Sequence, residues 1–177
     1  PTALPAPAPV VRTADSRFRN LPGYPFAPHY VEVANPHSKG RLRMHYVDEG
    51  DGPVMLFVHG TPTNSWEYRH LIAALKGTHR CIAPDHLGFG LSERPAGFAY
   101  SPEAHASALA EFVDRLGLDR FTLVVHDFGG PIGLPLCMAH PERVTRLVLL
   151  NTWMWPFDDD PSMRRKAAFA GGVLGRW

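Results

Sequence analysis

The chain has 177 residues, with 18 lysines and arginines against 17 aspartates and glutamates. This length is enough for one domain with a hydrophobic core, and the near-neutral charge gives no indication of a nucleic-acid partner. No apolar run reaches the roughly 18 residues that a membrane span needs, so we expect no membrane partner and a cytoplasmic location. The first residue is Pro1 rather than methionine, so a lost leader, with a periplasmic or secreted location, stays open.

The beginning of the chain predicts an arm followed by two paired strands. Proline alternates with alanine up to residue 9, so we expect residues 1–11 to form a disordered or extended arm. Residues 30–33 and 41–48 have strand composition, and turn-forming residues separate them at 35–40. They predict an antiparallel pair near the start of the core, which we expect to cover residues 12–152.

Apolar runs alternate with amphipathic segments over the rest of this core. Short aliphatic runs, typical of buried strands, lie at residues 54–58, 80–84, 121–125 and 146–150. Segments with the helical spacing of apolar residues lie at 66–75, 102–116 and 131–140. Ser101 is the expected N-cap of the second helix, and Gly117 its end. In the first helix, Leu71 is expected on the buried side. The alternation predicts an α/β fold with a mainly parallel sheet and helices on both faces.

The stretch 121–130 carries the chemistry. Its strand runs straight into His126-Asp127-Phe128 and two glycines, and a helix follows. A strand that turns sharply into a helix, with a nucleophile at the corner, is the nucleophile elbow of an α/β-hydrolase. With Asp127 at the corner, a carboxylate oxygen can attack an sp3 carbon that carries a leaving group, which gives an alkyl-enzyme ester. Hydrolysis of that ester passes through an oxyanion, and the backbone N–H groups of Phe128 and Thr61 are the expected donors.

These polar residues also have structural interpretations. Aspartate before a helix is commonly an N-cap, which is the competing interpretation of Asp127. His59 and His126 flank the expected site, but we favour a role in orienting loops through hydrogen bonds. Asp85 and His86 could form an acid–base pair, although their place before the nucleophile favours loop stabilisation.

Other residues bear on partners and cofactors. Cys81 and Cys137 lie in apolar stretches and are expected to be buried free thiols. The aspartates at 158–160 could bind a metal, but a solvated turn is favoured, so we expect no metal and no cofactor. Residues 153–177 change character and are expected to begin a helical cap domain. Trp153 and Trp155 either pack at the hinge of that cap or line a substrate pocket.

Five motifs together resemble the haloalkane dehalogenase family. They are Arg12-Thr-Ala-Asp-Ser-Arg-Phe with Tyr24-Pro-Phe, His59-Gly-Thr-Pro-Thr, Ala83-Pro-Asp-His-Leu-Gly-Phe-Gly-Leu-Ser, Val125-His-Asp-Phe-Gly-Gly and Arg146-Leu-Val-Leu-Leu-Asn. The resemblance implies an α/β-hydrolase core in which Asp127 is the nucleophile and Thr61 and Phe128 form the oxyanion hole. It also implies that Asn151 supports the residues of the site without contacting the substrate, and that the substrate is a small, apolar, haloalkane-like molecule.

The chain departs from this family in its halide donors. The family holds the leaving halide with two N–H donors, usually a tryptophan directly after the nucleophile and often an asparagine after His-Gly. Here those positions are Phe128 and Thr61, whose side chains have no N–H group. Trp153, Trp155 or Trp177 would have to supply a donor instead.

The histidine and acid of the expected mechanism are also missing. In this fold both follow the nucleophile in the chain, whereas only His140 comes after Asp127, in the helix that follows the elbow. We therefore expect this chain to be the N-terminal portion of a hydrolase of roughly 300 residues, interrupted inside its cap and inactive alone.

The sequence thus predicts a hydrolase that acts through an ester on Asp127, with haloalkane-like substrates. Epoxide hydrolase or another α/β-hydrolase is the alternative among enzymes, although an ester hydrolase is disfavoured because carboxylate attack on an ester gives an anhydride. Outside enzymes, the alternative is a non-catalytic, incomplete small-molecule-binding fragment. The sequence does not determine the oligomeric state.

Overall fold

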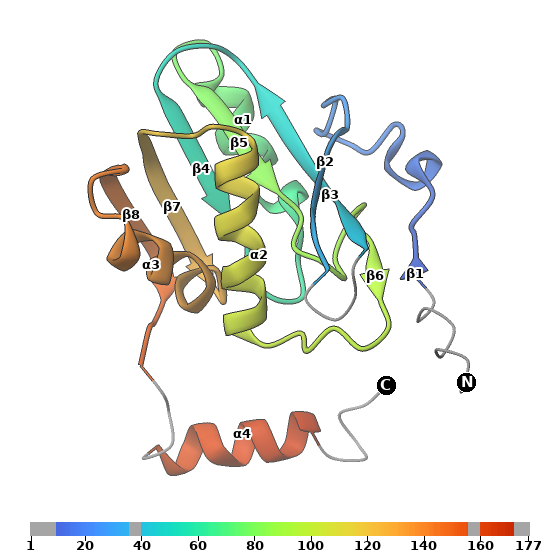
Figure 1. The fold of residues 1–177 in the computed structure, drawn as a ribbon, viewed down its shortest axis with the longest axis vertical. Coiled ribbons are helices and arrows are strands. Elements are labelled where there is room, and N and C mark those ends of the chain that lie inside the picture. Colours follow the sequence, from blue (N-terminus) through green and yellow to red (C-terminus); the bar gives the residue numbers. More distant parts are fainter. Residues whose placement is uncertain (1–9, 36–39, 156–159, 172–177) are drawn as a thin grey trace, which may run out of the picture.

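A computed structural model describes residues 10–35, 40–155 and 160–171, and a six-stranded sheet lies at its centre (Figure 1). The strands of the sheet are β2 (His29–Ala34), β3 (Arg41–Glu49), β4 (Val54–Val58), β5 (Arg80–Pro84), β7 (Phe121–Asp127) and β8 (Val144–Thr152). They lie in the order β2-β3-β5-β4-β7-β8, with β5, β4, β7 and β8 parallel and with β2 and β3 as an antiparallel pair. The predicted sheet is confirmed.

Helices cover both faces of this sheet (Figure 1). They are α1 (Arg69–Leu75), α2 (Pro102–Arg115) and α3 (Gly129–Ala139), whereas α4 (Pro161–Gly171) lies apart from the sheet. α2 and α3 lie side by side on one face, where Leu109 and Ile132 pack with Leu56 of β4. α1 covers the other face, where Ile72 packs with Phe57. Because neighbouring side chains of a strand point to opposite faces, consecutive residues of β4 belong to different core clusters.

The ends of α2 follow from its sequence. Ser101 has an extended backbone, and its hydroxyl accepts a hydrogen bond from Ala104 N at 3.3 Å. Pro102 takes the first helical position, where its missing N–H group leaves no intrahelical bond unmade. Gly117 follows the helix with φ +60°, a left-handed conformation that glycine adopts without steric cost. Both predicted limits of this helix are confirmed.

The first predicted helix is shorter than expected. Residues Ser65–Tyr68 form a 3-10 turn, η2, and α1 begins only at Arg69. Asn64 caps η2, and its side-chain oxygen accepts from Trp66 N at 3.0 Å. The prediction that Leu71 is buried is wrong, because Leu71 is 41% exposed. The buried face is defined by Ile72, and one residue along a helix turns the side chain by about 100°.

A second, two-stranded sheet does not follow from the sequence pattern. β1 (Val10–Val11), at the end of the predicted arm, pairs antiparallel with β6 (Arg94–Pro95). Strands of two residues carry no periodic signal, so composition cannot reveal them. Next to this pair, Arg12 forms an ion pair with the buried carboxylate of Glu93. Residues 1–9, the rest of the predicted arm, lie outside the described part.

Both cysteines are free thiols, as expected, but only Cys81 is fully buried and Cys137 is half-buried. Within the described residues, no helix has both the length and the apolar character that crossing a bilayer requires.

Three buried histidines lie together beneath the start of α2. The rings of His59 and His86 are 4.2 Å apart between centroids, and His86 and His105 are 5.3 Å apart. Burial lowers the pKa of all three imidazoles, and for His105 to about 4, with the nearby His59 adding to the effect. Nδ1 of His105 is buried without a hydrogen-bond partner in the described part of the chain, and Phe98 and Tyr100 pack around its ring.

These histidines predict that the protein loses stability in mild acid. Below pH 6.5 the unfolded chain binds protons that the folded chain does not, so the free energy of unfolding falls until the folded pKa is reached. For His105 alone the expected loss between pH 7.5 and 5 is about 2 kcal/mol. Replacing His105 with phenylalanine should remove this part of the pH dependence.

Urea unfolding at pH 7.5 and pH 5 checks this prediction. His105→Phe should lose less stability than the unaltered protein over that interval, and His70→Gln, a change at an exposed histidine, is the matched control. Equal losses in the unaltered protein and His105→Phe would contradict the assignment.

Candidate active site

The carboxyl ends of four parallel strands meet at one edge of the sheet. The loop 59–63 follows β4, Asp85 follows β5, Asp127 ends β7, and Trp153 follows β8. In open α/β sheets, ligands bind in the crevice outside these strand ends. Three of the sequence motifs therefore lie in loops at this edge.

Asp127 stands at the corner between β7 and α3 in an unusual backbone conformation. Its φ is +50°, in the left-handed region that non-glycine residues rarely adopt. Its Oδ1 accepts a hydrogen bond from Thr61 N at 3.0 Å, and its backbone carbonyl accepts one from Thr152 Oγ1 at 2.6 Å. The loop after β4 and the last residue of β8 therefore hold this corner from both sides.

Two glycines allow the loop after β4 to lie close to Asp127 and the start of α3 to lie close to the end of β4. A Cβ at Gly60 would lie 2.5 Å from Oδ1 of Asp127, and a Cβ at Gly129 would lie 2.1 Å from the carbonyl oxygen of Val58. Only a residue without a side chain fits at either position. The N-cap of α3 is Phe128, so the competing interpretation of Asp127 as the cap residue is wrong.

His59 and His86 hold the loop after β4 through a closed set of hydrogen bonds. His86 N donates to Nε2 of His59 at 3.0 Å, so the proton of His59 is on Nδ1, which donates to the carbonyl of Gly60 at 2.7 Å. Nε2 of His86 lies 3.1 Å from the carbonyl oxygen of His59. Because burial lowers both pKa values, the two rings are neutral at pH 7. The loop-orienting role expected for His59 is confirmed.

Asp85 also has the expected loop-stabilising role. It is fully buried, and its carboxylate accepts from Ser65 N at 2.7 Å and from Leu91 N at 2.9 Å. It also lies 2.7 Å from Nδ1 of His45. Burial would raise the pKa of Asp85, but the hydrogen bond and charge of His45, with His59 and Ser65 N, hold it below its usual value. His45 was not predicted, since it reaches Asp85 from the neighbouring strand β3, with no signal in local sequence.

Glu67 is a further residue that the sequence did not indicate. Its carboxylate joins two residues of this edge, with Oε1 against Nδ1 of His126 and Oε2 against the hydroxyl of Thr63. The side chain of Glu67 is 17% exposed and that of His126 is 37% exposed. His126 thus has the loop-orienting contact expected for it, with Glu67 as its partner.

The remaining predicted site residues that the structure describes lie at or just after the ends of β7 and β8. Phe128 is 37% exposed, and its ring meets that of Trp153 edge to face at 5.0 Å. Trp153 is half-buried and Trp155 is 65% exposed. Asn151 is exposed and has φ +40°, while its neighbour Thr152 makes the bond to Asp127. Trp177 lies outside the described residues.

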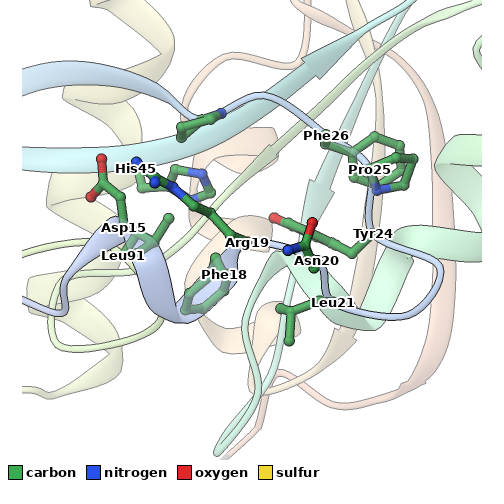
Figure 2. Close-up of a pocket in the computed structure, with 11 residues that line it drawn as sticks. Asp15, Phe18, Arg19, Asn20, Leu21, Tyr24, Pro25, Phe26, His45 and Leu91 are labelled. Atoms are coloured by element: carbon green, nitrogen blue, oxygen red, sulfur yellow. The ribbon is translucent and has the colours of Figure 1, made fainter.

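Two cavities of similar size compete as the substrate pocket. One, of about 560 Å³, lies under the N-terminal segment between Phe18, Phe26 and His45 (Figure 2). None of its lining residues is at the Asp127 corner. The other, of about 550 Å³, is lined by Phe128 and by residues of α2, α3 and the segment after β8, which are mostly apolar, such as Pro131, Trp153 and Trp155, but include Glu103 and Ser107 of α2. Its place beside the corner makes it the candidate substrate pocket.

No group of three or more histidine, cysteine, aspartate or glutamate side chains in the described part of the chain is arranged to hold a metal ion. Asp160 caps α4, since its carboxylate accepts from Ser162 N at 2.8 Å; Asp158 and Asp159 lie outside the described residues. His140 follows the last residue of α3, at the opposite end of that helix from the corner, and its Nδ1 is 3.4 Å from Glu142.

Comparison with known proteins extends these findings. A family model described as the alpha/beta hydrolase fold matches residues 53–177. Among curated relatives, haloalkane dehalogenase 2 of Mycobacterium tuberculosis is 50% identical over 76% of this chain and 45% of its own length. A cis-3-alkyl-4-alkyloxetan-2-one decarboxylase of Shewanella oneidensis is 41% identical over 76% of this chain and 42% of its own length. The chain therefore spans about half the length of these relatives.

Solved structures with a similar fold include a haloalkane dehalogenase and an epoxide hydrolase. The haloalkane dehalogenase DpaA of Paraglaciecola agarilytica, described as tetrameric, has a TM-score of 0.73 and 36% identity, over 81% of this chain and 49% of its own. An epoxide hydrolase of Bacillus megaterium has a TM-score of 0.67 and 30% identity, over 79% of this chain and 49% of its own. With the family model covering more than half of the sequence, the chain belongs to the α/β-hydrolase fold family.

Proposed function

We propose that this chain carries the nucleophile of a hydrolase that forms an alkyl-enzyme ester on Asp127, with haloalkane-like molecules as its substrates. The observation that carries the proposal is the strained corner, where Asp127 has φ +50° and its Oδ1 accepts from Thr61 N at 3.0 Å. Backbone strain of this kind persists where the surrounding structure imposes it, and it is common at catalytic nucleophiles.

The first step is an attack on carbon. The hydrogen bond from Thr61 engages Oδ1, which leaves Oδ2 of Asp127 to attack an sp3 carbon of the substrate. The new O–C bond forms as the carbon–halogen bond breaks, and the electron pair leaves with the halide. The product is an ester whose carbonyl oxygen is Oδ1.

The second step is hydrolysis at the carboxyl carbon of Asp127. Water adds to this carbon, one proton of the water passes to a base, and negative charge develops on Oδ1. When the C=O bond re-forms, the bond from the carboxyl carbon to Oδ2 breaks, and the alcohol leaves with Oδ2 and the proton that the base returns. The second proton of the water is released as the carboxylate of Asp127 is restored. Thr61 N–H is already directed at Oδ1, and the N–H of Phe128 is the second proposed donor. We propose a histidine as this base, and His140 is not that residue, because it lies at the far end of α3.

A second candidate function follows from Phe128. Its side chain has no N–H group to stabilise a leaving halide. A strained oxygen ring, as in an epoxide or an oxetan-2-one, can be opened by the same carboxylate without releasing a separate anion. The relatives from Bacillus megaterium and Shewanella oneidensis are named for these ring systems, which supports testing them.

A substrate panel tests the proposal. The full-length protein should release halide from 1-bromo- and 1-chloroalkanes, measured by ion chromatography. Turnover of epoxides or oxetan-2-ones without halide release would favour the second candidate instead. Ligand binding with no product and no adduct on Asp127 would mean a non-catalytic binding protein, and the proposal would fail.

A further inference from the structure

Glu67 links the two loops that meet at Asp127. Thr63 belongs to the loop after β4, which also carries the donor Thr61, and His126 directly precedes Asp127 on β7. The carboxylate of Glu67, on η2, touches both Thr63 Oγ1 and His126 Nδ1. We propose that Glu67 is a positioning residue that fixes the Thr61 amide against Asp127 during ester hydrolysis; this inference rests on the proposed function.

The geometry explains why such a link is needed. Besides the pairing of β4 with β7, one direct hydrogen bond joins the two loops within the described residues, from Thr61 N to Asp127 Oδ1. Thr63 is tied back to Gly60 by its own N–H at 3.2 Å, so the loop 60–63 is one closed turn. A contact that holds Thr63 therefore also holds Thr61, two residues away.

The contact is specific for a carboxylate. Both partners donate, one through a ring N–H and the other through a hydroxyl, and glutamate offers two acceptor oxygens. The hydroxyl of Thr63 is also 3.1 Å from the carbonyl of Gly60, but its one proton favours the charged acceptor. Glutamine would keep one acceptor and turn an NH2 group toward a second donor. Because the side chain of Glu67 is only 17% exposed, water replaces the lost acceptor poorly.

The effect should fall on one chemical step. The donor of Thr61 matters most when Oδ1 becomes an oxyanion, which happens in hydrolysis of the ester and not in its formation. Loss of a whole oxyanion donor costs about 10²–10³ in rate, so displacement of this donor should cost less. We expect at least tenfold slower ester hydrolysis in Glu67→Gln, while the rate of ester formation and the KM change less than threefold.

The test uses rapid-quench mass spectrometry of the full-length protein mixed with a 1-haloalkane. In Glu67→Gln the alkylated Asp127 should accumulate in the steady state and decay at least tenfold more slowly than in the unaltered protein. Thr63→Val, which removes the hydroxyl at constant shape, should do the same, and Thr63→Ser, which keeps it, should not. Glu49→Gln is the matched control, because Glu49 is 21% exposed, pairs with Lys76 at 2.7 Å, and lies at the opposite edge of the sheet.

Three results would overturn the inference. If the ester forms and decays in Glu67→Gln as in the unaltered protein, Glu67 has no positioning role. If Glu49→Gln slows hydrolysis equally, the effect is one of general stability. If no variant, nor the unaltered protein, ever carries an adduct on Asp127, the proposed function itself fails and this inference with it.

Discussion

Replacing Asp127 with asparagine should lower kcat for halide release from a 1-haloalkane by at least about 10⁴-fold in the full-length protein. The amide has nearly the same shape, and its oxygen can still accept from Thr61 N, so the corner should stay folded. It lacks the negative charge that makes a carboxylate oxygen a nucleophile. Halide release measured with the enzyme at high concentration gives the residual rate.

Asp119→Asn is the control for this substitution, since Asp119 is an exposed aspartate before β7. It should keep full activity and an unchanged urea midpoint. Halide release that survives Asp127→Asn would show that another group attacks the substrate, and the proposed mechanism would then be wrong.

Replacing Gly60 with alanine should lower kcat by about 10²–10³-fold, the cost of losing an oxyanion donor. The added Cβ would lie 2.5 Å from both Cβ and Oδ1 of Asp127, so the carboxylate must move away from Thr61 N. The overlap should also cost about 1–3 kcal/mol in the free energy of unfolding, which is typical of an overpacked site. Steady-state kinetics and urea unfolding measure the two effects separately.

Gly77→Ala provides the matched control. A Cβ at Gly77 would have no atom within 4 Å, so activity should be unchanged and stability equal or slightly higher. If Gly60→Ala keeps the activity of the unaltered protein, the close contact between the loop 59–63 and Asp127 is not part of the working enzyme.

The strands at the centre of the sheet and the nucleophile corner could be predicted because their signals are local. β4, β5 and β7 are mainly apolar runs, and the last of them ends at Asp127, which Phe128 and two glycines follow. The helix α2 has its cap, its proline and its glycine in the sequence itself. Each of these features depends on residues that are close to one another in the sequence.

The contacts that hold the site could not be predicted, because they depend on strand order and register. His45 reaches Asp85 only because β3 lies beside β5, and Glu67 reaches His126 only because β4 lies beside β7. A single sequence contains no record of which strands are neighbours.

The contact between β8 and Asp127 is the clearest example of a feature that could not be predicted from the sequence. The register between β7 and β8 shifts by one residue, so that His126 pairs with Leu150 but Asp127 pairs with Thr152. Asn151 is the extra residue of this irregularity, and Thr152 takes the place opposite the corner and bonds to its carbonyl. The observed contact from β8 to Asp127 is thus made by Thr152. The supporting role that the resemblance implies for Asn151 stays a prediction. An Asn151→Ala variant with normal kinetics would assign the support to Thr152.

A single-turnover reaction in H₂¹⁸O tests the ester on Asp127 most directly. The full-length protein, in excess over a 1-haloalkane, should give an alcohol with ¹⁶O taken from Oδ2 of Asp127. The ¹⁸O of the water should then be found in the peptide that contains Asp127. If the first-turnover alcohol carries ¹⁸O and the peptide does not, water attacks the substrate directly, and Asp127 is not the nucleophile.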